Sequence, residues 1–207
     1  MKLIIFGATG TLGSHLVEQA LTQGHLVTAF ARNPSALKKH HRNLTYRPGD
    51  VLDTHAVTDA IEGHDAVLIA LGAGRQGKIR SAGTLHIVSA MAHHGVRRVV
   101  CLSTLGVGDS RAVLNFFWKR IMFGLLLKQA YADHEAQEAI INQSEFDWTI
   151  VRPGAFTNGP ATGTYKHGFA STEKNLKLKI SRADVANFML QQLTDDSYLR
   201  RSPGLSY

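Results

Sequence analysis

The sequence of 207 residues has little cysteine and no long apolar run, and both shortages exclude classes of protein. Its single cysteine, Cys101, excludes an intrachain disulfide, a four-cysteine zinc site and an iron–sulfur cluster held by this chain's own cysteines. No run approaches the roughly 20 apolar residues that a membrane-spanning helix needs. The start has no signal-peptide layout, because its apolar run stops at Gly7. We therefore expect one cytoplasmic domain over residues 1–207 without a membrane span.

Acidic residues are also fewer than basic ones: 16 Asp and Glu oppose 23 Lys and Arg, which gives a net charge of +7. Such a balance can indicate a nucleic-acid partner, an anionic small molecule or simply a basic surface. The basic residues are spread from Lys2 to Arg201 and form no long arm or stripe interleaved with aromatic residues. We therefore predict no nucleic-acid partner.

Short apolar runs alternate with helical patterns along most of the chain. Apolar runs without polar alternation are typical of strands buried on both faces, as in a parallel sheet covered by helices. The pattern predicts a doubly wound, Rossmann-like α/β fold with a small irregular C-terminal part. The expected strands cover residues 3–6, 26–31, 44–47, 66–71, 97–102 and 148–151, and the expected helices cover 13–23, 54–62, 79–94, 131–144 and 181–193.

The clearest motif is a glycine-rich loop, residues 7–13, between the first expected strand and the first expected helix. Gly7 allows a tight turn, Gly10 lets the backbone approach a pyrophosphate and Gly13 lets the helix pack close to the strand. The helix N-terminus then offers N–H groups and a partial positive charge to the phosphates. The G-x-x-G-x-x-G spacing resembles the short-chain dehydrogenase/reductase superfamily. We expect the dinucleotide to contact Gly7, Thr9, Gly10, Thr11, Leu12 and Gly13.

The end of the second strand favours NADP(H) over NAD(H). The carboxylate that binds the ribose of NAD about 20 residues after the loop is absent, and Arg32 lies there instead. An arginine can bind a 2′-phosphate through charge-assisted hydrogen bonds worth about 1.5–3 kcal/mol. In the superfamily, the pair that matches Asp50 and Val51 borders the adenine. Further contacts are expected after the fourth strand, from Leu71, Gly72 and Ala73.

The nicotinamide end is expected where the fifth strand ends, at Ser103 and Thr104. The superfamily keeps its catalytic serine there, and a hydroxyl can bond a substrate carbonyl or the cofactor amide. The usual Tyr-x-x-x-Lys partner is missing, because Glu135 stands four residues after Tyr131. A nearby carboxylate raises a phenol pKa, so we expect no ordinary alcohol–ketone chemistry and a packing role for Tyr131. His134 either bonds a reduced acceptor or is a surface helix residue.

Several short motifs occur in the order found in one narrower family. Together they resemble the flavin reductase, or biliverdin-IXβ reductase, family of atypical short-chain reductases over nearly the whole chain. That resemblance implies an NADPH-dependent hydride donor to flavins and linear tetrapyrroles, with an open acceptor site and with Ser103 and His134 as active-site residues. The motifs are residues 7–10, 49–52, 65–67, 99–103, Asp133-His134, 162–165, Ile180-Ser181 with Asp184, 188–190, and Leu193-Thr194 with Asp196 and Tyr198.

The stretch after the sixth strand departs from that family. It reads Arg152-Pro153-Gly154-Ala155-Phe156, with alanine where one member of the family carries a histidine. The Arg-Pro-Gly form resembles the neighbouring NmrA-like branch, whose members often bind NADP as redox sensors. We expect cofactor contacts from Pro153, Gly154 and Phe156. The leading interpretation is an NADPH-dependent reductase of flavin-like, quinone-like or linear tetrapyrrole acceptors. The alternative is a non-catalytic NADP(H)-binding regulator, and the absent Tyr–Lys pair disfavours a sugar-nucleotide epimerase or dehydratase.

Residues 115–127 form an unusual apolar and aromatic stretch, interrupted by Lys119 and Arg120. Four interpretations stay open: a lid over the acceptor, a dimer contact, a helix packed on the sheet, or an amphipathic helix at a membrane surface. We expect the acceptor-binding portion within 104–130 and 153–180, and a monomer or homodimer. No metal is expected, because His134 and Glu138 at i,i+4 spacing make only two ligands.

Overall fold

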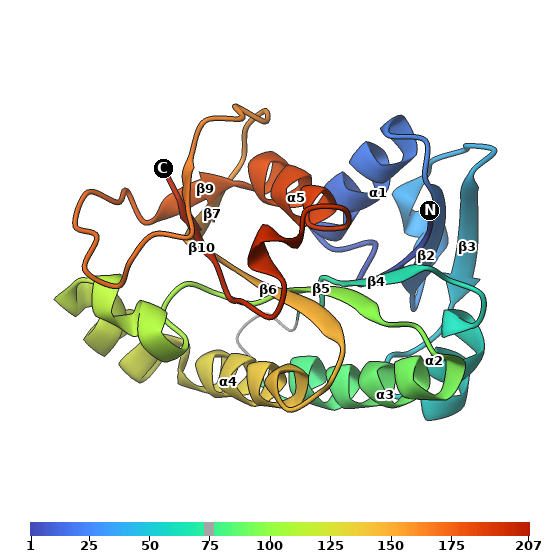
Figure 1. Cartoon of the computed structure of the whole chain (residues 1–207), viewed down its shortest axis with the longest axis horizontal. Coiled ribbons are helices and arrows are strands. Elements are labelled where there is room, and N and C mark those ends of the chain that lie inside the picture. The colour runs from blue at the N-terminus through green and yellow to red at the C-terminus, as the bar shows by residue number, and fades with distance from the viewer. Residues whose placement is uncertain (73–76) are drawn as a thin grey trace.

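The computed structural model describes residues 1–72 and 77–207. Apolar strands pair into a mostly parallel sheet that lies between two layers of helices (Figure 1). The strands are β1 (Lys2–Phe6), β2 (Leu26–Ala31), β3 (Leu44–Pro48), β4 (Ala66–Ile69), β5 (Arg98–Leu102), β6 (Asp147–Pro153), β7 (Ala155–Thr157), β8 (Lys166–His167), β9 (Lys179–Ser181) and β10 (Gly204–Ser206). The α-helices are α1 (Gly13–Thr22), α2 (Thr54–Ile61), α3 (Ile79–His94), α4 (Lys128–Asn142) and α5 (Arg182–Gln191). Short 3₁₀ helices at Pro34–Leu37, Gly108–Val113 and Asp196–Tyr198 and a π-helix at Phe117–Leu126 accompany them.

The main sheet has the strand order β3-β2-β1-β4-β5-β6-β10-β8. Successive strands run outward from β1 to β3, and the chain then crosses to β4 on the other side of β1. Helices α1 and α5 cover one face, and α2, α3 and α4 cover the other (Figure 1). This is the expected doubly wound α/β fold, and all six expected strands are present. Its crossover between β1 and β4 is the point at which such sheets bind nucleotides.

Burial on both faces explains why the strands read as continuous apolar runs. Along β1, Leu3 and Ile5 face the core beneath α1 and α5, while Ile4 and Phe6 face the core beneath α2 and α3. All four side chains are fully buried. A strand that contributes to two cores has no polar face, so the period-two alternation of a half-buried strand is absent.

The C-terminal part adds strands that the sequence pattern does not reveal. Strand β10 pairs in parallel with β6, and Gly154 N–H donates a hydrogen bond to Leu205 O at 2.9 Å. A separate pair, β7 with β9, lies beside it. These strands are two or three residues long, which is too short for any periodicity to show.

The C-terminal motifs meet at the buried carboxylate of Asp184. It accepts hydrogen bonds from the backbone N–H groups of Thr162 and Gly163 at 2.8 and 2.9 Å, and from the Tyr207 hydroxyl at 2.6 Å. The Ser181 hydroxyl caps α5 by accepting from Asp184 N–H. Burial opposes ionisation, but these hydrogen bonds outweigh it and hold the pKa of Asp184 below its usual value. Motifs about twenty residues apart are thus tied together by one charged group.

A buried ion pair ties α4 to the end of β6. Both guanidinium edges of Arg152 face acids: Nε and Nη2 donate to the two carboxylate oxygens of Glu138 at 3.0 and 2.6 Å, and Nη1 contacts Asp109. Glu138 and Arg152 are buried, whereas the Asp109 side chain is 84% exposed. The pair is bidentate, so it fixes orientation as well as distance.

Removing one partner of this pair is expected to destabilise the fold strongly. Glu138→Ala leaves the Arg152 charge buried without its main partner, which costs about 3–5 kcal/mol. Asp109→Ala removes the exposed partner of the same arginine and should cost at most about 1 kcal/mol. Urea unfolding of both variants measures the difference, and equal losses would contradict the assigned roles.

Candidate functional site

A cavity of about 1000 Å³ runs along the carboxyl ends of the parallel strands. Residues that follow β1, β2, β3, β4, β5 and β6 all line it, as the fold predicts. Of the expected site residues, Gly13 lies outside its lining and Ala73 lies outside the described residues. The cavity brings together Gly7, Thr9, Gly10, Thr11, Leu12, Arg32, Asp50, Val51, Leu71, Gly72, Ser103, Thr104, His134, Pro153, Gly154 and Phe156.

The glycine-rich loop is packed so tightly that side chains are excluded at two positions. Gly7 has φ +81°, and a Cβ there would collide with the carbonyl oxygen of Ala70. A Cβ on Gly13 would collide with the carbonyl oxygen of Gly7. The turn and the close helix–strand approach therefore need glycine, which confirms the expected structural roles of Gly7 and Gly13. Gly10 is exposed on the loop, and its N–H donates to Gly7 O at 2.9 Å.

At one end of the cavity the lining suits an adenosine. Arg32 is exposed at the rim directly after β2. Asp50 Oδ1 accepts from Leu52 N–H at 3.0 Å and so shapes the turn after β3. Val51 packs against α3 at Gly83, where a Cβ would lie 2.7 Å from Val51 Cγ2. Val51 therefore lies between α3 and the cavity.

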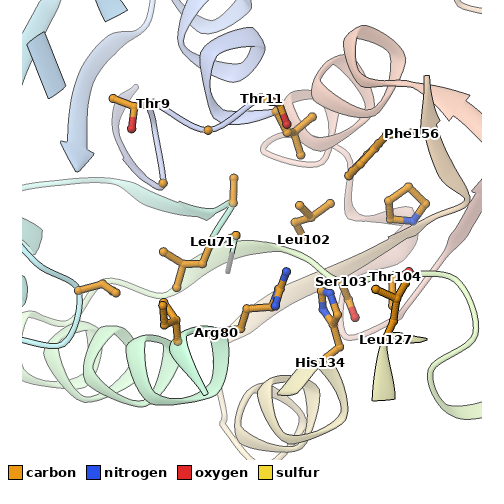
Figure 2. Close-up of a pocket in the computed structure, with 18 of the residues that line it drawn as sticks. Thr9, Thr11, Leu71, Arg80, Leu102, Ser103, Thr104, Leu127, His134 and Phe156 are labelled. Atoms are coloured by element: carbon orange, nitrogen blue, oxygen red, sulfur yellow. The ribbon is translucent and has the colours of Figure 1, made fainter. Parts of the chain in front are cut away.

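Midway along the cavity lies a cluster of three buried polar side chains: Arg80 from the first turn of α3, Ser103 after β5 and His134 from α4 (Figure 2). They are 8%, 3% and 9% exposed. Arg80 Nε and Nη1, Ser103 Oγ and His134 Nδ1 have no hydrogen-bond partner within residues 1–72 and 77–207. Buried polar atoms without partners are costly. Their position on a cavity wall therefore suits them to the polar atoms of a bound ligand.

Asp133 fixes this cluster in place rather than lining the cavity. Its carboxylate accepts from the backbone N–H groups of Arg80 and Ser81, both at 3.0 Å, and from the Ser81 hydroxyl at 2.6 Å. It thus caps the start of α3 from the neighbouring helix, and Arg80 Nη1 lies 3.5 Å away. Burial opposes ionisation, but the Ser81 hydrogen bonds and the Arg80 charge hold the pKa of Asp133 below its usual value.

His134 does not titrate near neutrality, unlike an unperturbed histidine side chain. Burial is the main cause, the positive charge of Arg80 adds to it, and together they lower the pKa of His134 to about 3. Asp133 opposes the shift without reversing it. The ring is also buried, which excludes its interpretation as a surface residue. At neutral pH His134 is a neutral hydrogen-bonding group and carries no proton to donate as an imidazolium.

Tyr131 and Glu138 have structural partners. The Tyr131 hydroxyl donates to Gly106 O at 2.9 Å and accepts from Arg111 Nη1 at 3.0 Å, and its ring packs on Phe123. Burial raises the pKa of Tyr131, and Glu135 raises it further against the opposing effect of Arg111. This agrees with the predicted packing role. Glu138, one helical turn from His134, is engaged by Arg152.

The far end of the cavity is an apolar chamber walled by the π-helix. The inner face of this helix places Trp118, Met122 and Phe123 on the cavity, followed by Leu127. Trp118 and Phe123 pack with ring centroids 5.8 Å apart. Residues of the 115–127 segment thus form one wall of the cavity. Across residues 1–72 and 77–207, no helix combines the length and apolarity that crossing a bilayer requires.

Arg80 is the principal residue that sequence reasoning missed. The sequence feature that could have indicated it is helical spacing, which places Arg80 on the same buried face of α3 as Gly83, Thr84 and Ile87. An arginine on such a face is rare unless a charge or a ligand meets it. The chamber residues before Leu127 were expected only as a segment, because their inner and outer faces depend on the π-helical turn.

A family model described as NAD(P)H-binding matches residues 7–196. The chain belongs to this NAD(P)H-binding family. It is 27% identical to the UPF0659 protein YMR090W of Saccharomyces cerevisiae, over 93% of this chain and 87% of the relative.

Two solved structures share the Rossmann-like fold of this NAD(P)H-binding chain. ChuY of Escherichia coli, described as an anaerobilin reductase, has a TM-score of 0.81 at 22% identity, over 100% of this chain and 97% of that one. A Veillonella parvula short-chain dehydrogenase/reductase in complex with NADP has a TM-score of 0.84 at 19% identity, over 100% and 94%. At these identities the likeness is one of fold.

The cavity fits the nicotinamide dinucleotide that the NAD(P)H-binding family implies. Gly7 and Gly13 form a tight turn that leaves the start of α1 facing the cavity, where phosphates are favoured. The unpartnered atoms of Arg80, Ser103 and His134 lie beyond it, where hydroxyl and amide groups of a bound ligand can satisfy them. A reduced nicotinamide bound there would be able to supply a hydride.

The ring of His134 is expected to stay neutral from about pH 5 to pH 8, because burial beside Arg80 disfavours its charged form. An NMR titration of the histidine ring protons measures this, and His134→Gln assigns the signal by deleting it. A midpoint near the unperturbed value of about 6.5 would contradict the buried, neutral ring.

Proposed function

We propose that this protein is an NADPH-dependent reductase that transfers hydride to a flat, conjugated acceptor of the flavin, quinone or linear tetrapyrrole class. The observation that carries the proposal is the continuity of the cavity: it joins the glycine-rich loop, the cluster of Arg80, Ser103 and His134, and the apolar chamber. The motifs shared with the flavin reductase family and the reductase neighbour of similar fold support it.

The preference for NADPH over NADH rests on Arg32. It lies at the rim of the cavity, one residue beyond β2, where a cofactor ribose is expected. A guanidinium there binds a 2′-phosphate through charge-assisted hydrogen bonds. The Veillonella parvula structure of similar fold holds NADP, which is consistent with this choice.

Three side chains are assigned roles around the reacting ring. Ser103 and neutral His134 each offer a hydrogen bond to the nicotinamide amide or to the acceptor edge. The nearby positive charge of Arg80 stabilises negative charge that develops on the acceptor as it receives the hydride. Because burial lowers the pKa of His134 to about 3, His134 is assigned a hydrogen-bonding role and not that of an acid.

The apolar chamber is assigned the acceptor. Trp118, Phe123 and Leu127 give a flat ring an apolar wall to pack on, and burial there excludes water from the hydride path. Proximity supplies most of the rate enhancement, which makes a Tyr–Lys acid unnecessary for acceptors that accept hydride readily.

Arg32→Ala is expected to weaken NADPH binding about tenfold to a hundredfold and to leave NADH binding nearly unchanged, since one charge-assisted contact is lost. Titration of both cofactors by fluorescence measures the ratio. Arg42→Ala, which removes an exposed arginine outside the cavity lining, is the matched control. An unchanged NADPH/NADH ratio in Arg32→Ala would contradict the assignment.

The reductase activity is tested by following NADPH absorbance with FMN, riboflavin, a quinone and biliverdin in turn. We expect oxidation with at least one acceptor, and a fall of about tenfold or more in kcat/KM when Ser103→Ala and His134→Ala are combined. Wild-type rates of NADPH oxidation in that double variant would contradict the roles assigned to Ser103 and His134. Tight NADPH binding with no oxidation by any acceptor would instead favour the non-catalytic regulator.

A further inference from the structure

The outer face of the π-helix is strongly apolar. Five of the nine large hydrophobic side chains that are exposed among the described residues lie within residues 116–126. Phe116 and Leu125 are 73% and 74% exposed. An apolar cluster of this kind on a chain whose other exposed apolar residues are scattered indicates a binding surface. We call the outer face the set Phe116, Phe117, Ile121, Leu125 and Leu126.

The charged residues of the segment that carries the outer face have one sign. Between Asp109 and Asp133 the sequence contains four basic residues and no acidic one. Arg120 and Lys128 are exposed, while Lys119 is half-buried and donates to Ala112 O at 3.3 Å. The surface therefore combines aromatic and aliphatic side chains with positive charge, and it lacks any carboxylate of its own.

This combination selects among possible occupants. A second copy of the chain in a symmetric dimer would place the same patch against itself, and residues 110–132 contain no carboxylate to pair with Arg120 and Lys128. A nucleic acid would meet the positive charge but would leave Ile121 and Leu125 without an apolar environment. A bilayer with anionic headgroups provides both an apolar layer and negative charge. We propose that the outer face docks on an anionic lipid surface.

The segment is held firmly enough to present this face. Asn115 Oδ1 accepts from Trp118 N–H at 3.1 Å at its start, and Leu127 N–H donates to Met122 O at 2.7 Å at its end. On the inner side, Phe123 packs on Tyr131 with ring centroids 5.1 Å apart. Docking would bring the chamber end of the cavity next to the bilayer, because the same helix walls both. The lipid proposal itself does not depend on hydride transfer.

The test uses the full chain and sucrose-loaded vesicles that are sedimented with the protein. Vesicles of phosphatidylcholine mixed with phosphatidylserine are compared with vesicles of phosphatidylcholine alone. We expect co-sedimentation with the anionic vesicles, weaker binding at high salt and little binding to the neutral vesicles.

Variants of the outer face separate its apolar and charged contributions. Ile121→Ser combined with Leu125→Ser is expected to lower vesicle partitioning about tenfold or more, because two apolar anchors are lost. Arg120→Gln should lower it about fivefold. Leu85→Ser, which removes an exposed leucine from α3 outside the cavity lining, is the matched control and should bind as the wild type does.

Circular dichroism and NADPH binding check that the variants remain folded, since none of these residues lines the cavity. Three results would overturn the proposal. They are no binding to anionic vesicles, an equal loss in Leu85→Ser, or a dimer in light scattering that the Ile121→Ser and Leu125→Ser pair dissociates. The last result would assign the face to a second copy.

Discussion

Backbone atoms at the first strand–helix turn pack so closely that Gly7 has room for no side chain beside Ala70, and Gly13 has none beside Gly7. This contact fixes where α1 begins relative to β1 and β4, the neighbouring strands between which the strand order reverses. The helix N-terminus and the strand ends consequently open on the same cavity. The turn therefore sets the position of the glycine-rich loop relative to the strand ends that form the rest of the cavity.

The opposite wall depends on how α4 is held. Asp133 binds the first turn of α3, and Glu138 binds Arg152 at the end of β6. His134 lies between these two attachments, so its ring is buried beside Arg80 with little freedom to move away. Asp133 and Glu138 thus have structural partners, and the part of the cavity wall on α3 and α4 presents the guanidinium of Arg80 and the neutral ring of His134. Such a wall suits a ligand that gains negative charge as it is reduced.

The sequence allowed strands β1 to β6, the crossover and the position of most expected site residues at the carboxyl ends of these strands to be predicted, because glycine spacing and continuous apolar runs have direct backbone causes. The neutral state of His134 could not be predicted, since it depends on burial and on Arg80, 54 positions away in the sequence. The chamber was anticipated only as an apolar segment. Its two faces follow from the π-helical turn, which no periodicity of 3.6 would indicate. Strand β10 is too short to leave a pattern.

A crystal structure of the protein with bound NADP⁺ tests the central claim most directly. We expect the 2′-phosphate at Arg32, the pyrophosphate on residues 7–13, and the nicotinamide against Ser103 and His134 with one ring face open to the apolar chamber. A cofactor bound with its nicotinamide outside this cluster, or with that ring face covered by protein, would contradict the account.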